Sequence, residues 1–239
     1  RAFDGDDARD RRDHRGASDE SGGGVAAHAA VVRAAGPAPG GGLGVLLNAG
    51  LLRGLAFADA AQRRLYYAYF AAIGLAVGAL MVLVPQAATG GEALIRGWVS
   101  AEAGVRVMLL LATARFCVIV ASYSTGVPGG IFAPILSLAA CVGVAFAAAV
   151  GEVMPDGSTA TGASVIAAMG GLFTASVRSP LVGVVLTLEL TDAYTLTLPL
   201  LTTCLASNLA AYWLGGKPIY SQLRDRTQKL AAAKPLPAR

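Results

Sequence analysis

Residues 124–134 read Ser-Thr-Gly-Val-Pro-Gly-Gly-Ile-Phe-Ala-Pro, and this stretch decides how the rest of the chain is interpreted. Its Pro-Gly-Gly step cannot continue a regular helix, whereas Pro134 suits the first turn of a helix that follows. We expect the first-turn amides around Gly130, Ile131 and Phe132 to lack helical acceptors and to point off a positively polarised helix end. Within a membrane, an uncharged amide cluster suits weak binding of a monovalent anion. A Gly/Pro turn between two packed helices explains the same residues, and the local sequence favours neither interpretation.

Lipid is predicted to be the solvent around most of the chain. Hydrophobic residues make up 55% of the 239 residues and charged residues only 14%, where a soluble domain carries roughly 25% charged residues. The charges gather in residues 1–24 and in the C-terminal tail, and few lie between. A soluble core of this size would distribute charge along the outer face of every helix.

Apolar segments follow one another at short intervals from Leu43 onward. Several reach the roughly twenty residues that cross a hydrocarbon core. Others hold 12 to 16 residues and are interrupted by Gly or Pro. Broken helices are tolerated at membrane depth where they line a cavity or lie against protein, so their repetition indicates a transporter. The predicted segments are Leu43–Ala60, Leu65–Val84, a short piece from Thr89 to Trp98, Val105–Tyr123, Ile131–Val150, Gly162–Val177, Pro180–Thr191, Tyr194–Leu214 and Lys217–Ala233.

The charged residues inside these segments are expected to face protein or water, because charge is costly in lipid. They are Arg115, Arg178 and Glu189. For Glu189 the residues alone leave two roles open, that of a proton carrier and that of a structural pairing or capping group. Asp192 is interpreted as a turn residue or as the N-cap of the helix from Tyr194.

The cysteines and histidines offer no metal or catalytic site. Cys117, Cys141 and Cys204 lie far apart in apolar runs, without the spacing of metal ligands, and are expected to be small buried residues. His14 lies in the polar leader and His28 beside an alanine run, and neither has a ligand partner in the sequence. No Ser/His or paired-carboxylate constellation supports an enzyme.

Four stretches resemble one known family. Gly130-Ile131-Phe132-Ala133-Pro134 resembles the G-x-F-x-P anion-binding signature of the CLC family of voltage-gated chloride channels and chloride/proton antiporters. Residues 170–181 resemble the stretch leading into the family's penultimate membrane helices, and residues 188–192 continue it. Residues 215–221, Gly-Gly-Lys-Pro-Ile-Tyr-Ser, resemble the segment that bears a chloride-coordinating tyrosine. The order matches the family over residues 43–233.

The resemblance implies a fold class and an anion site. The fold is an all-α polytopic membrane protein with broken and tilted helices, corresponding to the second inverted repeat of the family plus its tail helix. The implied chloride-binding residues are Gly130, Ile131 and Phe132, through backbone N–H groups, and Tyr220, through its hydroxyl. A tyrosine at a membrane interface is the alternative for Tyr220. No catalytic residue, metal or cofactor is implied.

The family's gate is expected to be missing from this sequence. The first repeat of the family supplies a serine-bearing loop, a G-x-E-x-P segment with the gating glutamate, and the internal proton-handling glutamate of exchangers. Neither the serine-bearing loop nor the G-x-E-x-P segment is found in this sequence. The sequence therefore does not distinguish a channel from an exchanger. The first hypothesis is therefore a chloride transporter that needs the missing N-terminal half. The others are a non-transporting remnant of a truncated transporter gene and an unrelated membrane enzyme.

The sequence is divided into three regions, and it also predicts the location and the partners of the protein. Residues 1–42 are interpreted as a disordered or non-native leader, residues 43–214 as the CLC-like transmembrane half and residues 215–239 as a cytoplasmic tail helix. The tail carries six basic residues against Asp225, which predicts a cytoplasmic C-terminus by the positive-inside tendency. A multi-pass location in the cell membrane is expected. The expected partners are chloride, the lipid bilayer, the missing half and a second copy through 180–214, and nucleic acid is not among them.

Overall fold

The fold is described from a computed structural model over residues 39–88, 104–127, 129–153 and 161–233. Within these ranges every regular element is a helix, which confirms the all-α class. The leader up to residue 38, the piece from Thr89 to Trp98 and Pro128 lie outside the described residues. The helices are α2 (Pro39–Leu83), α3 (Pro85–Ala88), α5 (Val105–Ser124), α6 (Phe132–Val153), α7 (Thr161–Val177), α8 (Pro180–Thr191), the 3₁₀ turn η1 (Tyr194–Leu196), α9 (Thr197–Trp213) and α10 (Ile219–Ala233).

Within the described residues, four helical stretches are long and apolar enough to cross a membrane. They are Gly40–Gln62, Leu65–Leu83, Val105–Ser124 and Phe132–Val150. Residues 194–214, which the sequence treats as one segment, divide into the 3₁₀ turn η1 and the 17-residue helix α9, so they are not among these stretches. At 1.5 Å per residue, α9 is about 25 Å long and falls short of a hydrocarbon core.

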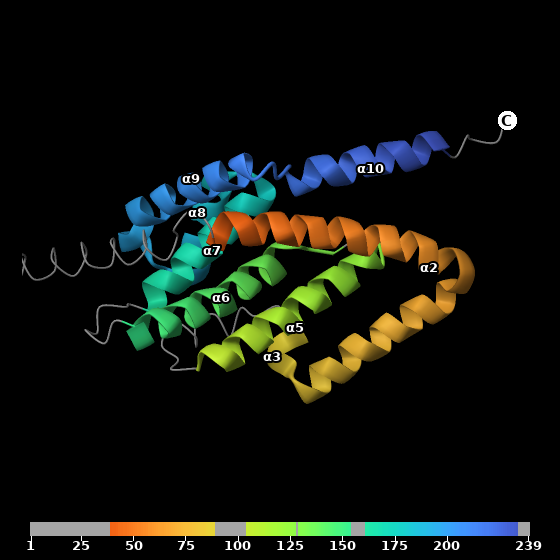
Figure 1. Ribbon diagram of the computed structural model, residues 1–239, viewed down its shortest axis with the longest axis horizontal. Coiled ribbons are helices and arrows are strands. Elements are labelled where there is room, and N and C mark those ends of the chain that lie inside the picture. Colours follow the sequence, from red (N-terminus) through yellow and green to blue (C-terminus); the bar gives the residue numbers. More distant parts are fainter. Residues whose placement is uncertain (1–38, 89–103, 128, 154–160, 234–239) are drawn as a thin grey trace, which may run out of the picture.

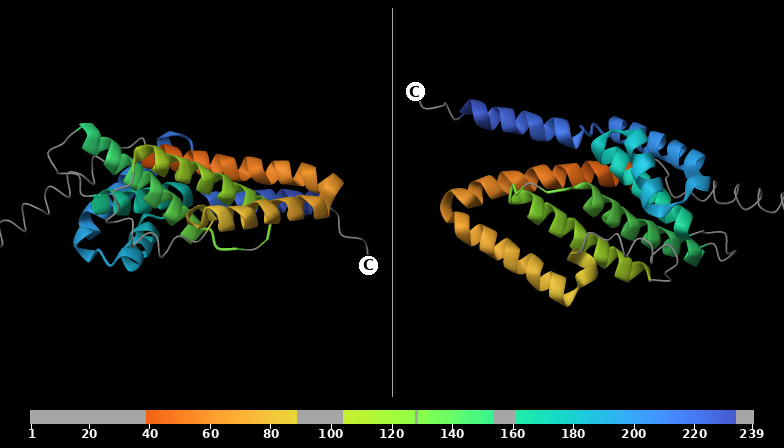
Figure 2. Two further views of the ribbon diagram at one scale, coloured as in Figure 1. Left: turned by 90° about the horizontal axis from the view of Figure 1, so that it is seen from below. Right: turned by 180° about the vertical axis from the view of Figure 1, so that it is seen from behind.

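Helix α2 consists of two arms joined at a kink. Leu65 has the non-helical dihedral angles φ −139° and ψ 57°, at the position where the sequence separates its first two segments. The second arm turns back toward α5 (Figure 2). The Tyr69 hydroxyl and Ser124 Oγ form a hydrogen bond of 2.7 Å, so the second arm is tied to the end of α5.

Helix α7 forms the centre of the molecule. It packs against α6, α9, α2 and α8 (Figure 1), and every residue from Ala163 to Ser176 except Ala168 is buried. Its largest fully buried side chain is Phe173. Among the cysteines, Cys141 and Cys204 are buried as expected, whereas Cys117 is exposed on α5.

The first arm of α2 approaches its neighbours through pairs of glycines four residues apart. A Cβ on Gly40 would lie 2.9 Å from Ser207 Oγ, and one on Gly44 would lie 2.6 Å from the Cβ of Ala175. Gly50 and Gly54 repeat the spacing toward α5. Small residues at this spacing allow close packing of helices in membranes. Helix α2 begins at Pro39, so residues 39–42, which the sequence assigns to the leader, form a packed helix start.

Helix α10 follows α9 after a short loop and runs alongside the first arm of α2 (Figure 1; Figure 2). Ile219, its first residue, is fully buried. Most of the residues after it are exposed. The attachment of α10 to the bundle therefore depends on Ile219, on the partly buried Leu223 and on a few polar contacts.

Candidate functional site

The candidate site begins at the start of α6. Phe132 is the first helical residue, and the Ile135 N–H donates to the carbonyl of Ile131. Among the described residues, the N–H groups of Gly130, Ile131 and Phe132 find no acceptor. A Cβ on Gly130 would meet nothing within 4 Å, so the space beside Gly130 is open. The structure thus places three unpaired donors at a helix end that carries partial positive charge.

Tyr220 reaches the same helix end from α10. Its ring centroid lies 6.4 Å from that of Phe132, with the ring planes at 88°. Phe132 in turn contacts Phe173 of α7, with ring centroids 5.2 Å apart. Phe132 is 40% exposed and Tyr220 44% exposed. Phe132 and Tyr220 are 88 positions apart in the sequence but lie next to each other in the fold, and each keeps an exposed side.

The phenol of Tyr220 stays protonated at physiological pH. Burial raises its pKa above the ordinary value, and the neighbouring Tyr123 raises that pKa further. A neutral hydroxyl is a hydrogen-bond donor, whereas a phenolate would repel an anion. No hydrogen bond to the Tyr220 hydroxyl is present among the described residues, so its donor is available to a ligand.

A cavity of about 490 Å³ lies beside the loop that precedes α6. Gly130 and Ile131 line it, but Phe132 and Tyr220 do not. The four predicted site residues therefore divide between this cavity and the open side next to α10. Tyr123 also lines the cavity, and the sequence did not single it out. Its position at the end of an apolar segment, directly before the 124–134 stretch, was the available signal.

Arg115, which is buried, and Arg178, which is partly buried, both donate to protein groups, as predicted. The Nη1 of Arg115 donates to Ser137 Oγ at 2.6 Å, and Arg115 is fully buried among apolar residues. Arg178 has a left-handed φ of 67°. Its Nη1 donates to the carbonyl of Asn208 at 2.6 Å and its Nη2 to the carbonyl of Gly216 at 2.5 Å.

Of the two acidic residues, Glu189 lacks, among the described residues, the pairing or capping partner that was considered for it, and Asp192 lies in the turn after α8. Glu189 is exposed on α8, and no ion pair or hydrogen bond of its side chain occurs within the described part of the chain. Asp192 is the C-cap of α8 in a left-handed conformation, with its N–H bonded to the carbonyl of Leu188. The N-cap interpretation of Asp192 is wrong, because Ala193 occupies the N-cap of η1 and makes no side-chain cap.

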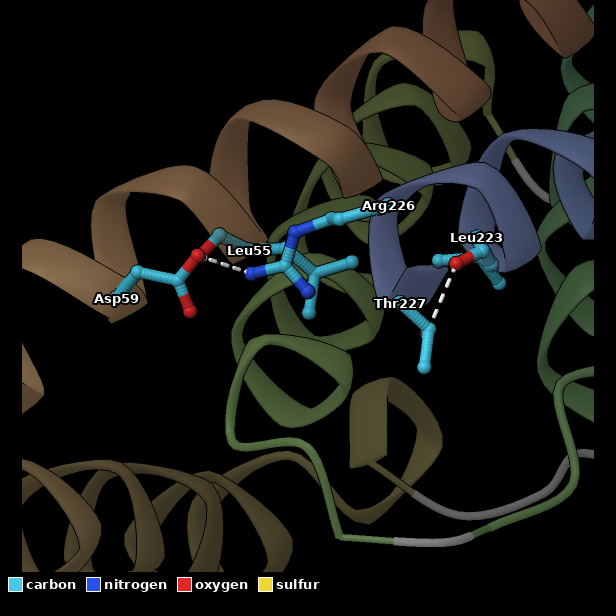
Figure 3. Close-up of polar contacts among 5 residues, drawn as sticks. All are labelled: Leu55, Asp59, Leu223, Arg226 and Thr227. Atoms are coloured by element: carbon cyan, nitrogen blue, oxygen red, sulfur yellow. Dashed lines mark hydrogen bonds and ion pairs between the residues drawn. The ribbon is translucent and has the colours of Figure 1, made fainter. Parts of the chain in front are cut away.

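An ion pair connects the exposed part of α10 to α2. The Nη2 of Arg226 contacts the carboxylate of Asp59 and also donates to the carbonyl of Leu55 at 3.2 Å (Figure 3). Figure 3 shows the guanidinium of Arg226 extended across the gap toward the α2 helix. Because Arg226 follows Tyr220 by six residues, this contact fixes the direction in which α10 leaves the site.

Comparisons with known proteins agree on one family. A family model described as voltage gated chloride channel matches residues 30–212. The H(+)/Cl(-) exchange transporter ClcA of Salmonella agona is 44% identical over 156 residues, which are 65% of this chain and 33% of that protein. ClcA of Vibrio parahaemolyticus is 40% identical over 168 residues, or 70% of this chain and 36% of that protein.

A solved structure supports the same grouping. A slow cyanobacterial Cl⁻/H⁺ antiporter superposes with a TM-score of 0.67 and 31% identity, over 85% of this chain and 47% of that chain. The chain therefore spans about a third of the length of the curated relatives and about half of the solved structure. All three relatives are named as transporters that exchange chloride and protons.

Proposed function

The chain belongs to the voltage-gated chloride channel family, and on that premise we propose that it forms part of a CLC-type chloride transporter. In this proposal the chain supplies one side of the central anion site, and an N-terminal half supplies the rest of the pathway and its gate. The relatives are named as exchange transporters, which supports transport over an enzymatic reaction.

The observation that carries the proposal is the meeting of two helix starts. The unpaired amides of residues 130–132 lie at the beginning of α6, and Tyr220 lies at the beginning of α10 with its ring against Phe132. Amides and a phenol hold no net charge, so they attract chloride without forming an ion pair. Conduction needs such weak binding, because an ion that is held too tightly is not released.

The exposed surfaces of the bundle support the need for a further half. In the second arm of α2, Leu65–Leu83, none of the residues in the most apolar 18-residue stretch is buried. Lipid can cover that apolar surface, but lipid offers nothing to the donors around Phe132 and Tyr220, which are also open. A protein half that lines a hydrated path would cover both. We therefore propose that the chain is insufficient for transport by itself.

Two further parts of the proposal concern the surroundings. The basic α10 belongs on the cytoplasmic side of the cell membrane, because positively charged segments are retained there. A homodimer through 180–214 is supported by the exposed apolar side chains of α8 and α9, such as Leu181, Leu198 and Trp213. Both features follow the family's pattern.

Chloride efflux from liposomes tests the main proposal. Liposomes that contain only this polypeptide should show no selective efflux, whereas liposomes that contain the chain co-expressed with the N-terminal half of the Salmonella agona exchanger should release chloride. Robust selective efflux from the polypeptide alone would contradict the need for a second half. Absence of efflux and of chloride binding in the co-expressed preparation would contradict the transport function.

The Tyr220 hydroxyl gives the residue-level test. Removal of one hydrogen bond to an ion costs about 1.5–3 kcal/mol, so Tyr220→Phe should weaken chloride affinity by about ten- to a hundredfold in titration calorimetry of the co-expressed preparation. Tyr212→Phe is the matched control, because Tyr212 is exposed at the end of α9, away from α6. Equal affinities of the two variants would remove Tyr220 from the site.

A further inference from the structure

The loop that carries Tyr220 into the site is held by side chains from two other parts of the fold. Arg178, directly after α7, donates to the carbonyl of Gly216 at 2.5 Å. Asn48 of α2 donates to the carbonyl of the next residue, Lys217, at 3.1 Å. Tyr220 follows three residues later. The carbonyls of two consecutive residues, Gly216 and Lys217, are therefore held from outside their own segment, and Gln222 Nε2 of α10 also donates to the Lys217 carbonyl at 2.8 Å.

Asn48 uses the whole of its amide group in this contact. Its Nδ2 also donates to the carbonyl of Ser176 at 3.0 Å, and its Oδ1 accepts from Ser176 Oγ. Asn48 is 3% exposed. The amide orientation is determined by these partners, since a flipped amide would set Oδ1 against two carbonyls. Asn48 thus links α2, the end of α7 and the loop before α10.

Arg178 holds its side of the loop from a strained backbone. Its φ of 67° is unfavourable for a residue with a side chain. A conformation of this kind persists where surrounding contacts determine it, and it is found disproportionately at functional sites. Here the contacts are the bonds from the guanidinium to Gly216 and to both the carbonyl and the Oδ1 of Asn208.

The loop backbone leaves little freedom of its own. Gly215 has a φ of 72°, which suits only glycine well. A Cβ on Gly216 would lie 2.5 Å from the Cγ2 of Val45 and 3.0 Å from the carbonyl oxygen of Ala211. Packing against α2 and α9 therefore limits the loop, and Asn48 and Arg178 also hold its carbonyls.

We propose that Asn48 and Arg178 are positioning residues for the anion site, which hold the carbonyls of Lys217 and Gly216 and thereby keep the Tyr220 hydroxyl at the start of α6. The inference rests on the proposed function for the role of Tyr220. Neither residue contacts the anion. Their effect on anion binding passes through the position of Tyr220.

A double-mutant cycle tests this dependence. Asn48→Asp has the same size but replaces the NH₂ donor by an oxygen, so the Lys217 carbonyl loses the bond from Asn48 and keeps only the one from Gln222 Nε2. In the co-expressed preparation, Asn48→Asp should weaken chloride affinity about tenfold. In a Tyr220→Phe background the same change should cause little further loss, because the hydroxyl that it displaces is already absent. An equal loss in both backgrounds would overturn the proposal.

Hydrogen exchange gives a measurement that does not depend on chloride. Exchange of the amides in residues 215–223 should become faster in Asn48→Asp and in Ser176→Ala, and the amides of α6 should be unaffected. Ser164→Ala is the matched control, because Ser164 is also buried on α7 but lies far from the loop. Unchanged exchange in residues 215–223 would overturn the proposal whatever the affinities are.

A second variant covers the case in which Asn48→Asp does not fold. Arg178→Lys keeps the charge but replaces the two guanidinium nitrogens that bond separately to Asn208 and Gly216 by one ammonium nitrogen, so faster exchange and weaker chloride binding are again expected. The two proposals fail separately. If Tyr220→Phe leaves affinity unchanged, the proposed site is wrong, whereas a normal Tyr220 effect with unaltered Asn48 and Arg178 variants contradicts only the positioning role.

Discussion

Gly44 should tolerate no side chain, although it lies in a helix where alanine is usually preferred. A Cβ at this position would lie 2.6 Å from the Cβ of Ala175, 3.0 Å from its carbonyl carbon and 3.1 Å from the backbone nitrogen of Ser176. Favourable contacts between carbon atoms occur at about 3.5–4.0 Å. Because two of the three neighbours are backbone atoms of the central helix α7, they cannot rotate away. Gly44→Ala should therefore destabilise the fold by about 1–3 kcal/mol, the usual cost of overpacking.

Gly42 provides a control in the same helix. A Cβ on Gly42 would meet nothing within 4 Å. Gly42→Ala should stabilise the fold by up to about 1 kcal/mol, because alanine has the higher helix propensity. The same chemical change two residues apart is thus expected to have opposite signs. The difference isolates the contact with α7 from any general effect of a glycine replacement.

Thermal unfolding in detergent measures both variants through thiol accessibility. Cys141 and Cys204 are fully buried and become reactive to a fluorogenic thiol dye only on unfolding. Cys117 is exposed and is replaced by serine in all variants. With about 2–4 °C per kcal/mol for a chain of this size, Gly44→Ala should lower the unfolding midpoint by about 2–12 °C. The reasoning is refuted if Gly44→Ala unfolds at the same temperature as Gly42→Ala or above it. Adding Ala175→Gly to Gly44→Ala should restore only part of the lost stability, since it removes the contact between the two Cβ atoms but leaves the two contacts with backbone atoms.

Two further predictions concern the surface. Arg226→Ala should lower the free energy of unfolding by only about 0.2–1 kcal/mol, because the ion pair with Asp59 is partly exposed. A high salt concentration should reduce this difference in stability between the variant and the parent chain. A loss of stability that does not depend on salt would show that the charge is not responsible. Leu205→Lys on α9 should shift the protein from dimer to monomer in cross-linking experiments in liposomes. Leu109→Lys on α5 is the control and should not do so, although Leu109 is 51% exposed and Leu205 52%. Retention of the dimer by Leu205→Lys would contradict an interface through α9.

The sequence was most informative where local chemistry determines the structure. The Pro-Gly-Gly step and Pro134 predicted the start of a helix with unpaired amides, and α6 begins at Phe132. The spans ending near Leu83 and Ser124 were also found within one residue of their predicted ends. These features depend on backbone geometry and on the length of apolar runs, both of which can be derived from residues close together in the chain.

The errors fall where distant residues decide the outcome. The glycines of residues 40–44 were assigned in part to a linker, because glycine is common in loops, but Gly40, Gly41 and Gly44 pack against α7 or α9. Cys117 was expected to be buried, yet it lies on the outer face of α5. An apolar run in a membrane protein does not reveal which of its faces meets protein, since lipid accepts every face.

The sequence by itself determined that this is an all-helical membrane protein, and its motifs identified the chloride channel family. It also named Tyr220, but only by resemblance. The tertiary structure decided that Tyr220 lies against Phe132, and that Asn48 and Arg178 hold the loop that precedes α10. The physical reason is that a helix start is specified by neighbouring residues, whereas the meeting of α6 and α10 depends on packing around α7 and on hydrogen bonds between groups as far as 169 residues apart.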